Sequence, residues 1–298
     1  PVNDIYAIYA YGELDINTKL LNFLTQKKVP IHFFNYYGFY SGSYYPREYL
    51  HSGFLLVKQV EHYTDKEKRL KIAKEFINSA SYNILKNLQY YEKHEKDVGK
   101  YLQEIENLRK EINNVSGIPE LMSIEGAIRS QYYASFNEIL REGFELDKRV
   151  KMPPDNMVNC LISFGNSMMY TTTLSEIYNT QLTPTISYLH EPGERRFSLS
   201  LDLSEVFKPV VVDRIIFALI NNRVIKPVHF LQELNYCYLN EDGKKIFVKE
   251  YDEKLKTTVM HKTLERKVSY QRLIRLECYK LVKHLIGEKE YEGFKTWW

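Results

Sequence analysis

The chain has 298 residues, of which 44% are apolar, and this is enough for one large domain or two smaller ones with buried cores. Its 41 Lys and Arg residues nearly balance 38 Asp and Glu residues, so net charge alone indicates no polyanionic or polycationic partner. The sequence contains no signal peptide, lipidation motif or apolar run of about 18 residues, which predicts no membrane association and a cytoplasmic location. Cys160, Cys237 and Cys278 lie far apart without a CxxC motif, which predicts free thiols.

Short apolar segments recur in the first part of the chain. Ile5 to Ala10 and Ile31 to Asn35 are typical of strands, and Asn17 to Lys28 is typical of a short helix capped by Asn17. The Tyr-rich stretch from Tyr36 to Tyr49 indicates an extended segment rather than a binding motif. The 25 Tyr residues offer possible platforms for stacked bases, but packing is the favoured role for most of them. We expect a small β-rich domain over residues 1–48.

From about Tyr49 onward the apolar spacing becomes helical. It predicts a larger, mostly α-helical domain over residues 49–298, and therefore an α+β fold. One amphipathic stretch runs from Val98 to Ile112. The exception is Tyr236 to Tyr251, where Asp242-Gly243 predicts the turn of a β-hairpin.

Glu125 lies within a predicted helix that begins near Pro119, a residue tolerated in a first helical turn. The apolar stripe of this helix includes Leu121 and Ile128, so Glu125 should point inward. A carboxylate in an interior or cleft needs a compensating cation or donor, because its desolvation costs on the order of several kcal/mol. The alternative is an ordinary half-exposed Glu near a helix N-terminus.

His190 ends an apolar stretch and is followed by a turn at Glu191 to Glu194. A second helix is predicted after that turn, with Pro209 as a bend. It carries Asp202 and Glu205 on one face, where a metal could bridge them. A core or turn role for His190, and ordinary first-turn chemistry for the acidic pair, remain alternatives. Two carboxylates and an imidazole from separate segments nevertheless form a ligand set for a divalent cation that activates a phosphate oxygen.

The segment from Lys254 to His284 carries nine Lys or Arg residues and two Glu residues. Its apolar spacing predicts an amphipathic helix with Arg272, Arg275 and Lys283 on the other face. A phosphate backbone could lie on that face, although a solvated face is the more common outcome for such a run.

Three segments together resemble the signature of a known family. They are IEGAIRSQYY around Glu125, VNCLISFGNSMMY around Asn159, and YLHEPGERRFSLSLDLSEVFKPVVVDR around His190 and Glu205. This combination is similar to that of the CRISPR-associated integrase of spacer acquisition, the first-numbered Cas protein. The resemblance covers effectively the whole chain.

The resemblance implies a manganese or magnesium site with Glu125, His190 and Glu205 as ligands and Asp202 as a nearby second acidic residue. Some members have Asp where this chain has Glu205, which keeps the charge and lengthens the arm. It also implies a homodimer that works with the second-numbered Cas protein. Because members normally have one further β-rich segment ahead of this point, the N-terminal domain of this chain is expected to be incomplete.

The expected function is therefore a metal-dependent DNA endonuclease and integrase that inserts short DNA segments into a repeat array by transesterification. A metal-dependent nuclease on branched DNA that integrates nothing would need the same site. A non-catalytic DNA-binding scaffold, with Glu125, His190 and Glu205 in structural roles, is the second alternative.

Overall fold

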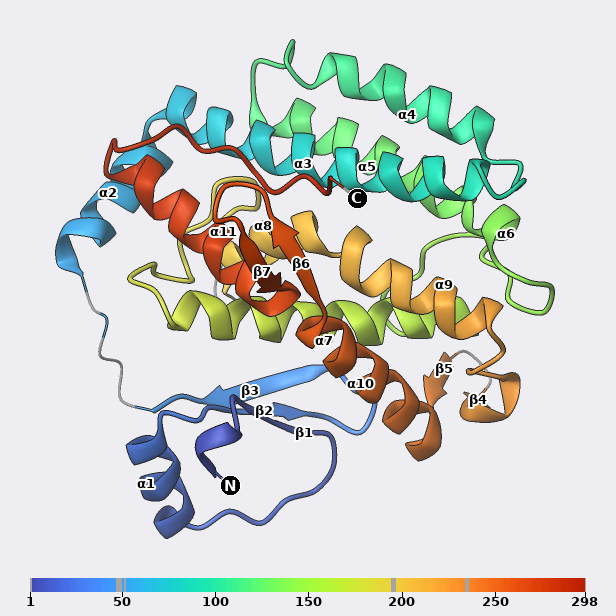
Figure 1. Ribbon diagram of the computed structural model, residues 1–298, viewed down its shortest axis with the longest axis horizontal. Helices are drawn as coiled ribbons and strands as arrows, with labels where there is room; N and C mark the ends of the chain where they lie inside the picture. The colour runs from blue at the N-terminus through green and yellow to red at the C-terminus, as the bar shows by residue number, and fades with distance from the viewer. Residues whose placement is uncertain (1, 47–49, 51, 194–196, 234–235, 298) are drawn as a thin grey trace.

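The computed structural model describes residues 2–46, 50, 52–193, 197–233 and 236–297. A small N-terminal sheet with its own helix precedes a larger helical body (Figure 1). The predicted α+β class is therefore confirmed. The predicted boundary between residues 48 and 49 lies outside the described residues.

The N-terminal sheet has the strand order β1-β2-β3. Strands β1 (Ile8–Ala10) and β2 (Ile31–Phe34) run parallel, and β3 (Tyr40–Tyr44) pairs antiparallel with β2. Helix α1 (Thr18–Lys27) connects the parallel pair and is capped by the Asn17 side chain, as predicted. A short 3-10 turn (Val2–Asp4) precedes β1, so the first strand begins later than the sequence pattern predicted.

The helical body is built from long helices and several shorter elements. The helices that follow the sheet are α2 (Gly53–Thr64), α3 (Lys66–Glu92), α4 (Gly99–Glu111), α5 (Ile118–Ala134), α6 (Phe136–Ile139) and α7 (Met157–Tyr178). After them come α8 (Ser198–Phe207), a π-helical turn (Pro209–Asp213), α9 (Arg214–Asn221), α10 (Glu241–Lys256) and α11 (Tyr270–Leu285). The bend predicted at Pro209 is confirmed as this π-helical turn, which joins α8 to α9.

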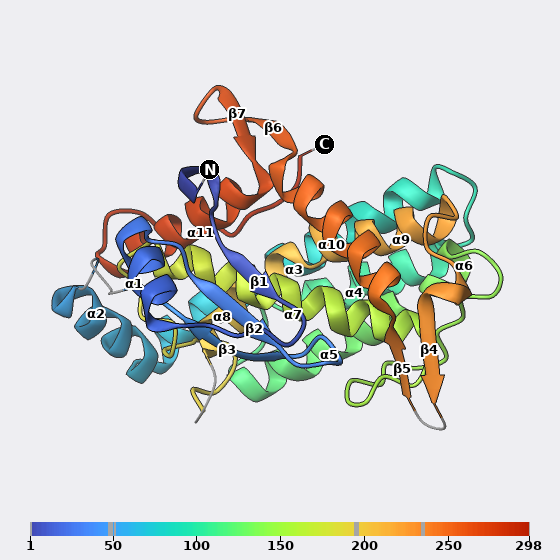
Figure 2. The same cartoon turned by 90° about the horizontal axis from the view of Figure 1, so that it is seen from below.

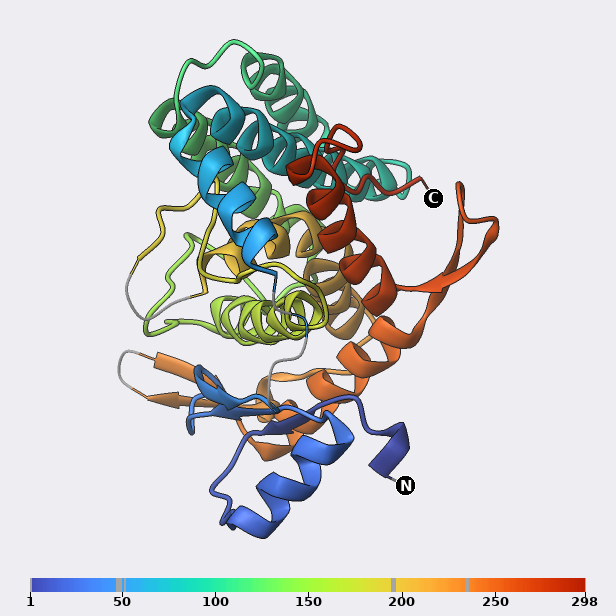
Figure 3. The same cartoon turned by 90° about the vertical axis from the view of Figure 1, so that its left-hand side faces the viewer.

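Helix α7 lies between the N-terminal sheet and helices α3, α5 and α8 (Figures 2 and 3). On the sheet side, the buried His32 ring of β2 bonds to the Ser175 hydroxyl of α7 at 2.6 Å. Glu176, one residue further on, is also buried and accepts hydrogen bonds from Tyr6 and from Arg275 of α11, each at 2.6 Å. These contacts join the N-terminal segment, α7 and α11.

The hairpin prediction for Tyr236 to Tyr251 is wrong in its placement. Asp242 and Gly243 lie in the first turn of α10, because the Asn240 side chain accepts a hydrogen bond from the Gly243 amide at 2.9 Å and caps that helix. A Cβ on Gly243 would lie 2.5 Å from the His229 carbonyl oxygen, so this glycine permits a close approach of two backbones. Besides β2 and β3, the antiparallel pairs of consecutive strands in the described residues are β4 (Phe230–Glu233) with β5 (Tyr236–Leu239), and β6 (Thr258–His261) with β7 (Arg266–Ser269).

Gly165 on α7 sets how closely the helical layers approach one another. A Cβ at this position would lie 2.5 Å from a Val212 methyl group and 2.9 Å from the Phe247 ring. We expect Gly165→Ala to lower the free energy of unfolding by about 1–3 kcal/mol, as overpacking does in a filled core. Urea denaturation would measure this loss. Gly126→Ala on α5 is the control, because a Cβ there meets no atom within 4 Å, and equal effects of the two substitutions would contradict the packing argument.

Candidate active site

A cavity of about 990 Å³ opens between α5, α7, α8 and the loop that precedes α7. Helix α5 contributes Glu125 and Arg129, α8 and its C-cap contribute Glu205 and Lys208, and His190 comes from the loop before α8. The predicted stripe on α5 is confirmed, since Leu121 and Ile128 are buried. Glu125 keeps 23% of its side chain exposed and faces the cavity from the margin of that stripe.

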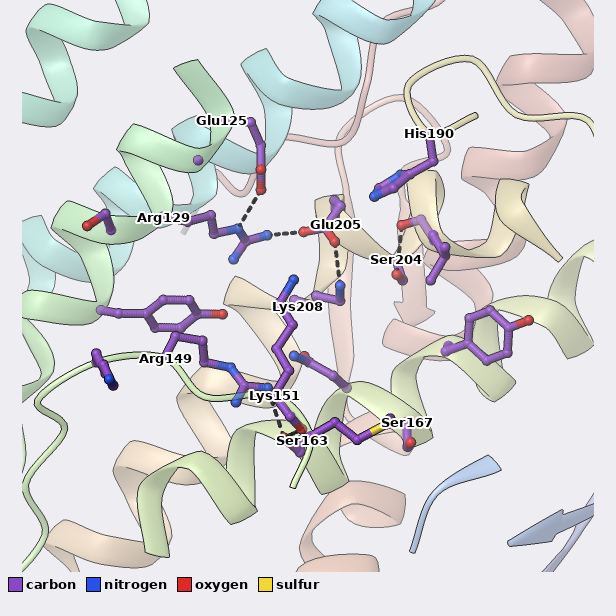
Figure 4. Close-up of a pocket in the computed structure, with 18 of the residues that line it drawn as sticks. Glu125, Arg129, Arg149, Lys151, Ser163, Ser167, His190, Ser204, Glu205 and Lys208 are labelled. Carbon is purple, nitrogen blue, oxygen red and sulfur yellow. Dashed lines mark hydrogen bonds and ion pairs between the residues drawn. The ribbon is translucent and has the colours of Figure 1, made fainter. Parts of the chain in front are cut away.

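Two cationic side chains pair with the carboxylates of this cavity (Figure 4). The Arg129 guanidinium donates from Nε to Glu125 at 3.2 Å and also forms an ion pair with Glu205. The other oxygen of Glu205 pairs with the Lys208 ammonium group. Arg129 Nη1 is buried and has no hydrogen-bond partner among the described residues. The site is thus a chain of alternating charges with Glu205 at its centre.

Glu205 is held in its ionised form by these neighbours. Burial by itself raises the pKa of a carboxyl group, but the charges of Lys208 and Arg129 outweigh it and lower the pKa of Glu205 to about 2. Burial likewise opposes the charge on Arg129, and the Glu205 and Glu125 carboxylates reverse this and raise the pKa of the guanidinium. Glu205 is therefore ionised and is already paired with two cations in this structure.

Asp202 lies on α8 one turn before Glu205, but its carboxylate points to the loop that carries His190. Its two oxygens accept hydrogen bonds from the backbone amides of Tyr188, Leu189 and His190 at 2.7–3.0 Å, and from His190 Nδ1 at 2.8 Å. Asp202 is fully buried, and this bonding leaves the neutral ring with its acceptor at Nε2. Asp202 therefore positions the imidazole, whereas the sequence pattern had offered it as a bridging ligand beside Glu205.

The protonation of His190 depends on the same contact. Burial lowers the pKa of the ring, but the hydrogen bond and charge of Asp202, together with the charge of Glu205, outweigh it and raise the pKa above 6.5. The ring keeps 25% of its surface exposed and lines the cavity.

The structure places Glu125, His190 and Glu205 on the lining of one cavity, and their role as metal ligands stays a prediction. Within the described part of the chain, however, no three His, Cys, Asp or Glu side chains lie close enough together to hold a metal ion. Arg129 stands between the two glutamates and supplies the positive charge. The donor types suit Mn²⁺ or Mg²⁺, and these side chains would have to rearrange around such an ion.

A basic loop closes the cavity on the side of α7. Asn159 shapes this loop, because its side chain donates to the Lys148 carbonyl at 2.9 Å and accepts from Arg149 at 3.0 Å. Ser163, one turn further along α7, accepts from Arg149 at 2.9 Å. The Asn and Ser of the middle signature segment thus present Lys148, Arg149 and Lys151 to the cavity.

The sequence interpretation did not include the cations of this site. Their spacing was available as a signal, since Arg129 follows Glu125 by four residues and Lys208 follows Glu205 by three, and both intervals place side chains on one helical face. The basic run from Lys148 to Lys151 was also visible in the sequence. Its position depends on the fold of the loop around Asn159.

The residues predicted as phosphate contacts near the C-terminus lie in a different arrangement from the one expected. The basic segment comprises the end of α10, the β6–β7 hairpin and α11 rather than one helix and its approach. Arg275 pairs with the buried Glu176, and Lys283 forms an ion pair with Glu288. Arg272 is exposed, with no ion pair to any residue that the structure describes. The role of all three as DNA contacts stays a prediction.

Asp213, in the π-helical turn, is a buried carboxyl group whose Oδ2 has no hydrogen-bond partner in the described ranges. Burial raises its pKa from 3.8 to about 6, although the Arg129 charge opposes this. A raised carboxyl pKa contributes stability that is fully present below about 3.8 and is lost as pH rises through about 6.

We therefore expect Asp213→Asn to be more stable than the wild type at pH 8 by about 2–3 kcal/mol, since each pKa unit corresponds to about 1.4 kcal/mol. The difference should disappear as pH falls below about 4. Urea denaturation of both proteins across this range measures it. A difference that does not change with pH would contradict the assignment.

The fold and the site define an α+β protein with a cavity lined by carboxylates, an imidazole and several cations. The family model described as CRISPR associated protein Cas1 matches residues 1–253. The chain belongs to this family, in agreement with the resemblance found in the sequence.

Relatives and solved structures match nearly the full chain. A CRISPR-associated endonuclease Cas1 of Fusobacterium nucleatum is 54% identical over 298 residues, which is 100% of this chain and 88% of the relative. The structure of TM1797, a Cas1 protein from Thermotoga maritima, has 43% identity and a TM-score of 0.88, and the match covers 99% of this chain and 91% of that one. A casposase bound to its integration product shares the fold, with a TM-score of 0.89, 22% identity and coverage of 98% and 82%.

None of the helices in the described ranges is both long and apolar enough to cross a membrane.

Proposed function

We propose that this protein is a metal-dependent DNA endonuclease and integrase that inserts short foreign DNA segments into a CRISPR repeat array. The observation that carries this proposal is the charge arrangement of the cavity. An ionised Glu205 lies between Arg129 and Lys208, while Glu125 and the His190 imidazole face the same space. Family membership supports the substrate class, since the Fusobacterium relative is named an endonuclease and the casposase is described with an integration product.

Glu125, His190 and Glu205 would hold a Mn²⁺ or Mg²⁺ ion. The imidazole favours Mn²⁺ without excluding Mg²⁺. When bound, such an ion would polarise a phosphate oxygen and lower the pKa of an attacking hydroxyl group or water. In this structure Arg129 and Lys208 are paired with the carboxylates. Binding of the metal ion to those carboxylates would free the two cations to face the phosphate.

The residues of this cavity suit phosphoryl transfer without a protein nucleophile. Arg129, Lys208 and Arg149 can balance the negative charge that spreads over the phosphate oxygens. Attack by a DNA 3′-hydroxyl group exchanges one phosphodiester for another, whereas attack by water cuts the strand. Asp202 keeps the His190 ring in one orientation during either reaction.

The DNA backbone would approach along the basic loop before α7. Lys148 and Lys151 are exposed at the cavity and form no ion pair with any described residue. We expect Lys151→Ala to weaken DNA binding equally for two unrelated duplexes, and to reduce the slope of log affinity against log salt by about one.

The same salt series for Arg272→Ala, Arg275→Ala and Lys283→Ala tests the alternative path on α11. We expect smaller losses there, because Arg275 and Lys283 already have acidic partners. Arg275→Ala should instead lower stability, since it leaves the buried Glu176 without its cation. Unchanged binding of Lys151→Ala together with a loss in the α11 variants would move the DNA path to the C-terminal helix.

The function itself is tested by incubating the protein with Mn²⁺ or Mg²⁺, a short duplex and a supercoiled plasmid that carries a repeat. Joined strands support the integrase, and cut strands without joining support a nuclease acting on branched DNA.

Joining is expected in the presence of the second-numbered Cas protein, and homodimers are expected by light scattering. Both partner proposals rest on family membership.

One observation favours a second candidate, a DNA-binding scaffold without catalysis. The cavity carboxylates are already neutralised by Arg129 and Lys208, and no group of three potential ligands lies close enough for a metal in the part of the chain that the structure describes. Calorimetric titration with Mn²⁺ separates the two candidates. A scaffold would bind DNA, but its titration with Mn²⁺ would release no heat from binding at this site.

A further inference from the structure

Two charged groups beside the candidate active site each have one buried atom without a hydrogen-bond partner among the described residues. One atom is Arg129 Nη1, a donor on α5, and the other is Asp213 Oδ2, an acceptor in the π-helical turn. Buried donors and acceptors are nearly always paired in folded proteins, because an unpaired one has lost its water without compensation. An unpaired donor and an unpaired acceptor at this place therefore call for a functional explanation.

Arg129 Nη1 is unpaired because the other two nitrogens of the guanidinium are engaged. Nε donates to Glu125 at 3.2 Å and Nη2 pairs with Glu205, as the dashed lines in Figure 4 show. The guanidinium is planar and its donors form a rigid fork, so Nη1 cannot be aimed at a new acceptor while both contacts hold. A further anionic partner of Arg129 can therefore bind it only in place of the glutamates.

The charge of Arg129 acts on Asp213, although the two side chains form no ion pair in the described part of the chain. Burial raises the pKa of Asp213 to about 6, and Arg129 has the largest effect among the groups that oppose this rise. Asp213 is only 2% exposed. Above about pH 6 it is thus a buried carboxylate without a cationic partner within the described ranges, and such a group destabilises the fold.

The π-helical turn that carries Asp213 is tied to the helix that carries Arg129. The Asn87 side chain donates to the Pro209 carbonyl at 2.8 Å and to the Tyr132 hydroxyl at 2.9 Å. Tyr132 follows Arg129 by three residues, so both side chains lie on one face of α5. These contacts fix the backbones of the two segments relative to each other, and the long arginine side chain is the part that can move.

We propose that Asp213 is the second anionic partner of Arg129 and takes over its guanidinium when the two glutamates bind a divalent cation. The inference rests on the proposed function, because it takes Glu125 and Glu205 as metal ligands. An arginine left beside a metal ion without an anion would repel that ion. Asp213 would hold the guanidinium by its Nη1 edge and leave the other nitrogens facing the cavity. It is thus a positioning residue for Arg129.

The first test needs no metal and uses urea denaturation at pH 8. In the wild-type background, Asp213→Asn should raise the urea midpoint, because it removes an unpaired buried charge. In a Glu205→Gln background, Arg129 loses its main anion and should pair with Asp213. Asp213→Asn should then lower the midpoint, because it removes that partner. A rise of equal size in both backgrounds would overturn the proposal.

The second test is a double-mutant cycle on Mn²⁺ affinity, measured by calorimetry at pH 8. Asp213→Asn should weaken Mn²⁺ binding about tenfold, the lower end of the losses seen when a group that supports metal ligands is removed. In an Arg129→Gln background, the same substitution should change the affinity less than about twofold, because no guanidinium needs a second anion. An equal loss in both backgrounds would show that Asp213 acts independently of Arg129, and the proposal would fail.

Asp252→Asn controls for the loss of one negative charge. Asp252 is an exposed aspartate on α10 that pairs with Lys256, outside the cavity, and its substitution should leave Mn²⁺ affinity unchanged. A wild-type protein that binds Mn²⁺ and cuts DNA, with equal affinity in Asp213→Asn, would overturn only the role of Asp213. A wild-type protein that binds no Mn²⁺ would overturn the proposed function, and this inference with it.

Discussion

Replacing Glu205 with Gln is expected to lower metal-dependent DNA cleavage at least about a hundredfold, the loss typical of removing one charged or polar stabilising group from an active site. Gln keeps the shape of the side chain and removes its charge. Arg129 and Lys208 would then lose their shared anion, and the proposed metal would lose a ligand. Cleavage rate and Mn²⁺ titration by calorimetry measure the two consequences.

Matched variants separate this effect from a loss of folding. Glu205→Asp keeps the charge on a shorter arm and should retain measurable Mn²⁺ binding. Glu120→Gln changes an exposed glutamate in the first turn of α5, which bonds only to Ser116 among the described residues, and should leave activity unchanged. Wild-type cleavage by Glu205→Gln would remove Glu205 from the catalytic site, while an equal loss in Glu120→Gln would point to a general effect of lost negative charge.

The second large effect, a loss of stability and of metal binding, is expected from substitutions of Asp202. Asp202→Ala leaves three backbone amides of the His190 loop without their acceptor, and each buried unsatisfied donor costs about 1–3 kcal/mol. We expect unfolding free energy to fall by about 3 kcal/mol or more. Asp202→Asn keeps the shape of the side chain, but its NH₂ group then faces the N–H donors of the His190 loop. We expect this variant to bind Mn²⁺ about 10–100-fold more weakly.

A positioning role makes a prediction that a purely structural role does not. Asp202 is what keeps the pKa of His190 raised, so its replacement by Asn should lower that pKa, because burial then acts with less opposition. NMR titration of the imidazole signals measures the change. Asp65→Asn is the matched control, since Asp65 also accepts two backbone amides but lies at the N-cap of α3. An unshifted His190 pKa in Asp202→Asn would assign Asp202 to loop stability alone.

Local sequence patterns predicted the features that depend on neighbours a few residues away. The Asn17 cap, the Pro119 helix start and the bend at Pro209 all depend on backbone geometry within one or two turns. The same helical period placed Glu125 toward the interior and put Asp202 and Glu205 on one helical face, and the structure places Glu125 and Glu205 on the lining of one cavity.

The sequence could not determine what those side chains meet there. An interval of three residues puts Asp202 and Glu205 on one face of α8, but only the packed loop gives Asp202 four donors and leaves Glu205 to Arg129 and Lys208. Hydrogen-bond partners of this kind come from other segments. Their choice depends on which loop lies over the helix.

The mistaken hairpin has the same physical origin. The residues from Asn240 to Gly243 suit both a tight turn and a helix N-terminus, because Asn and Asp side chains accept hydrogen bonds from nearby backbone amides in either structure. The close contact between Gly243 and the His229 backbone accompanies the helix in this protein. The sequence was therefore enough to identify the family, the fold class and the inward-facing position of Glu125. The tertiary structure alone decided the partners of each charge, because those partners are brought together by packing between segments far apart in the chain.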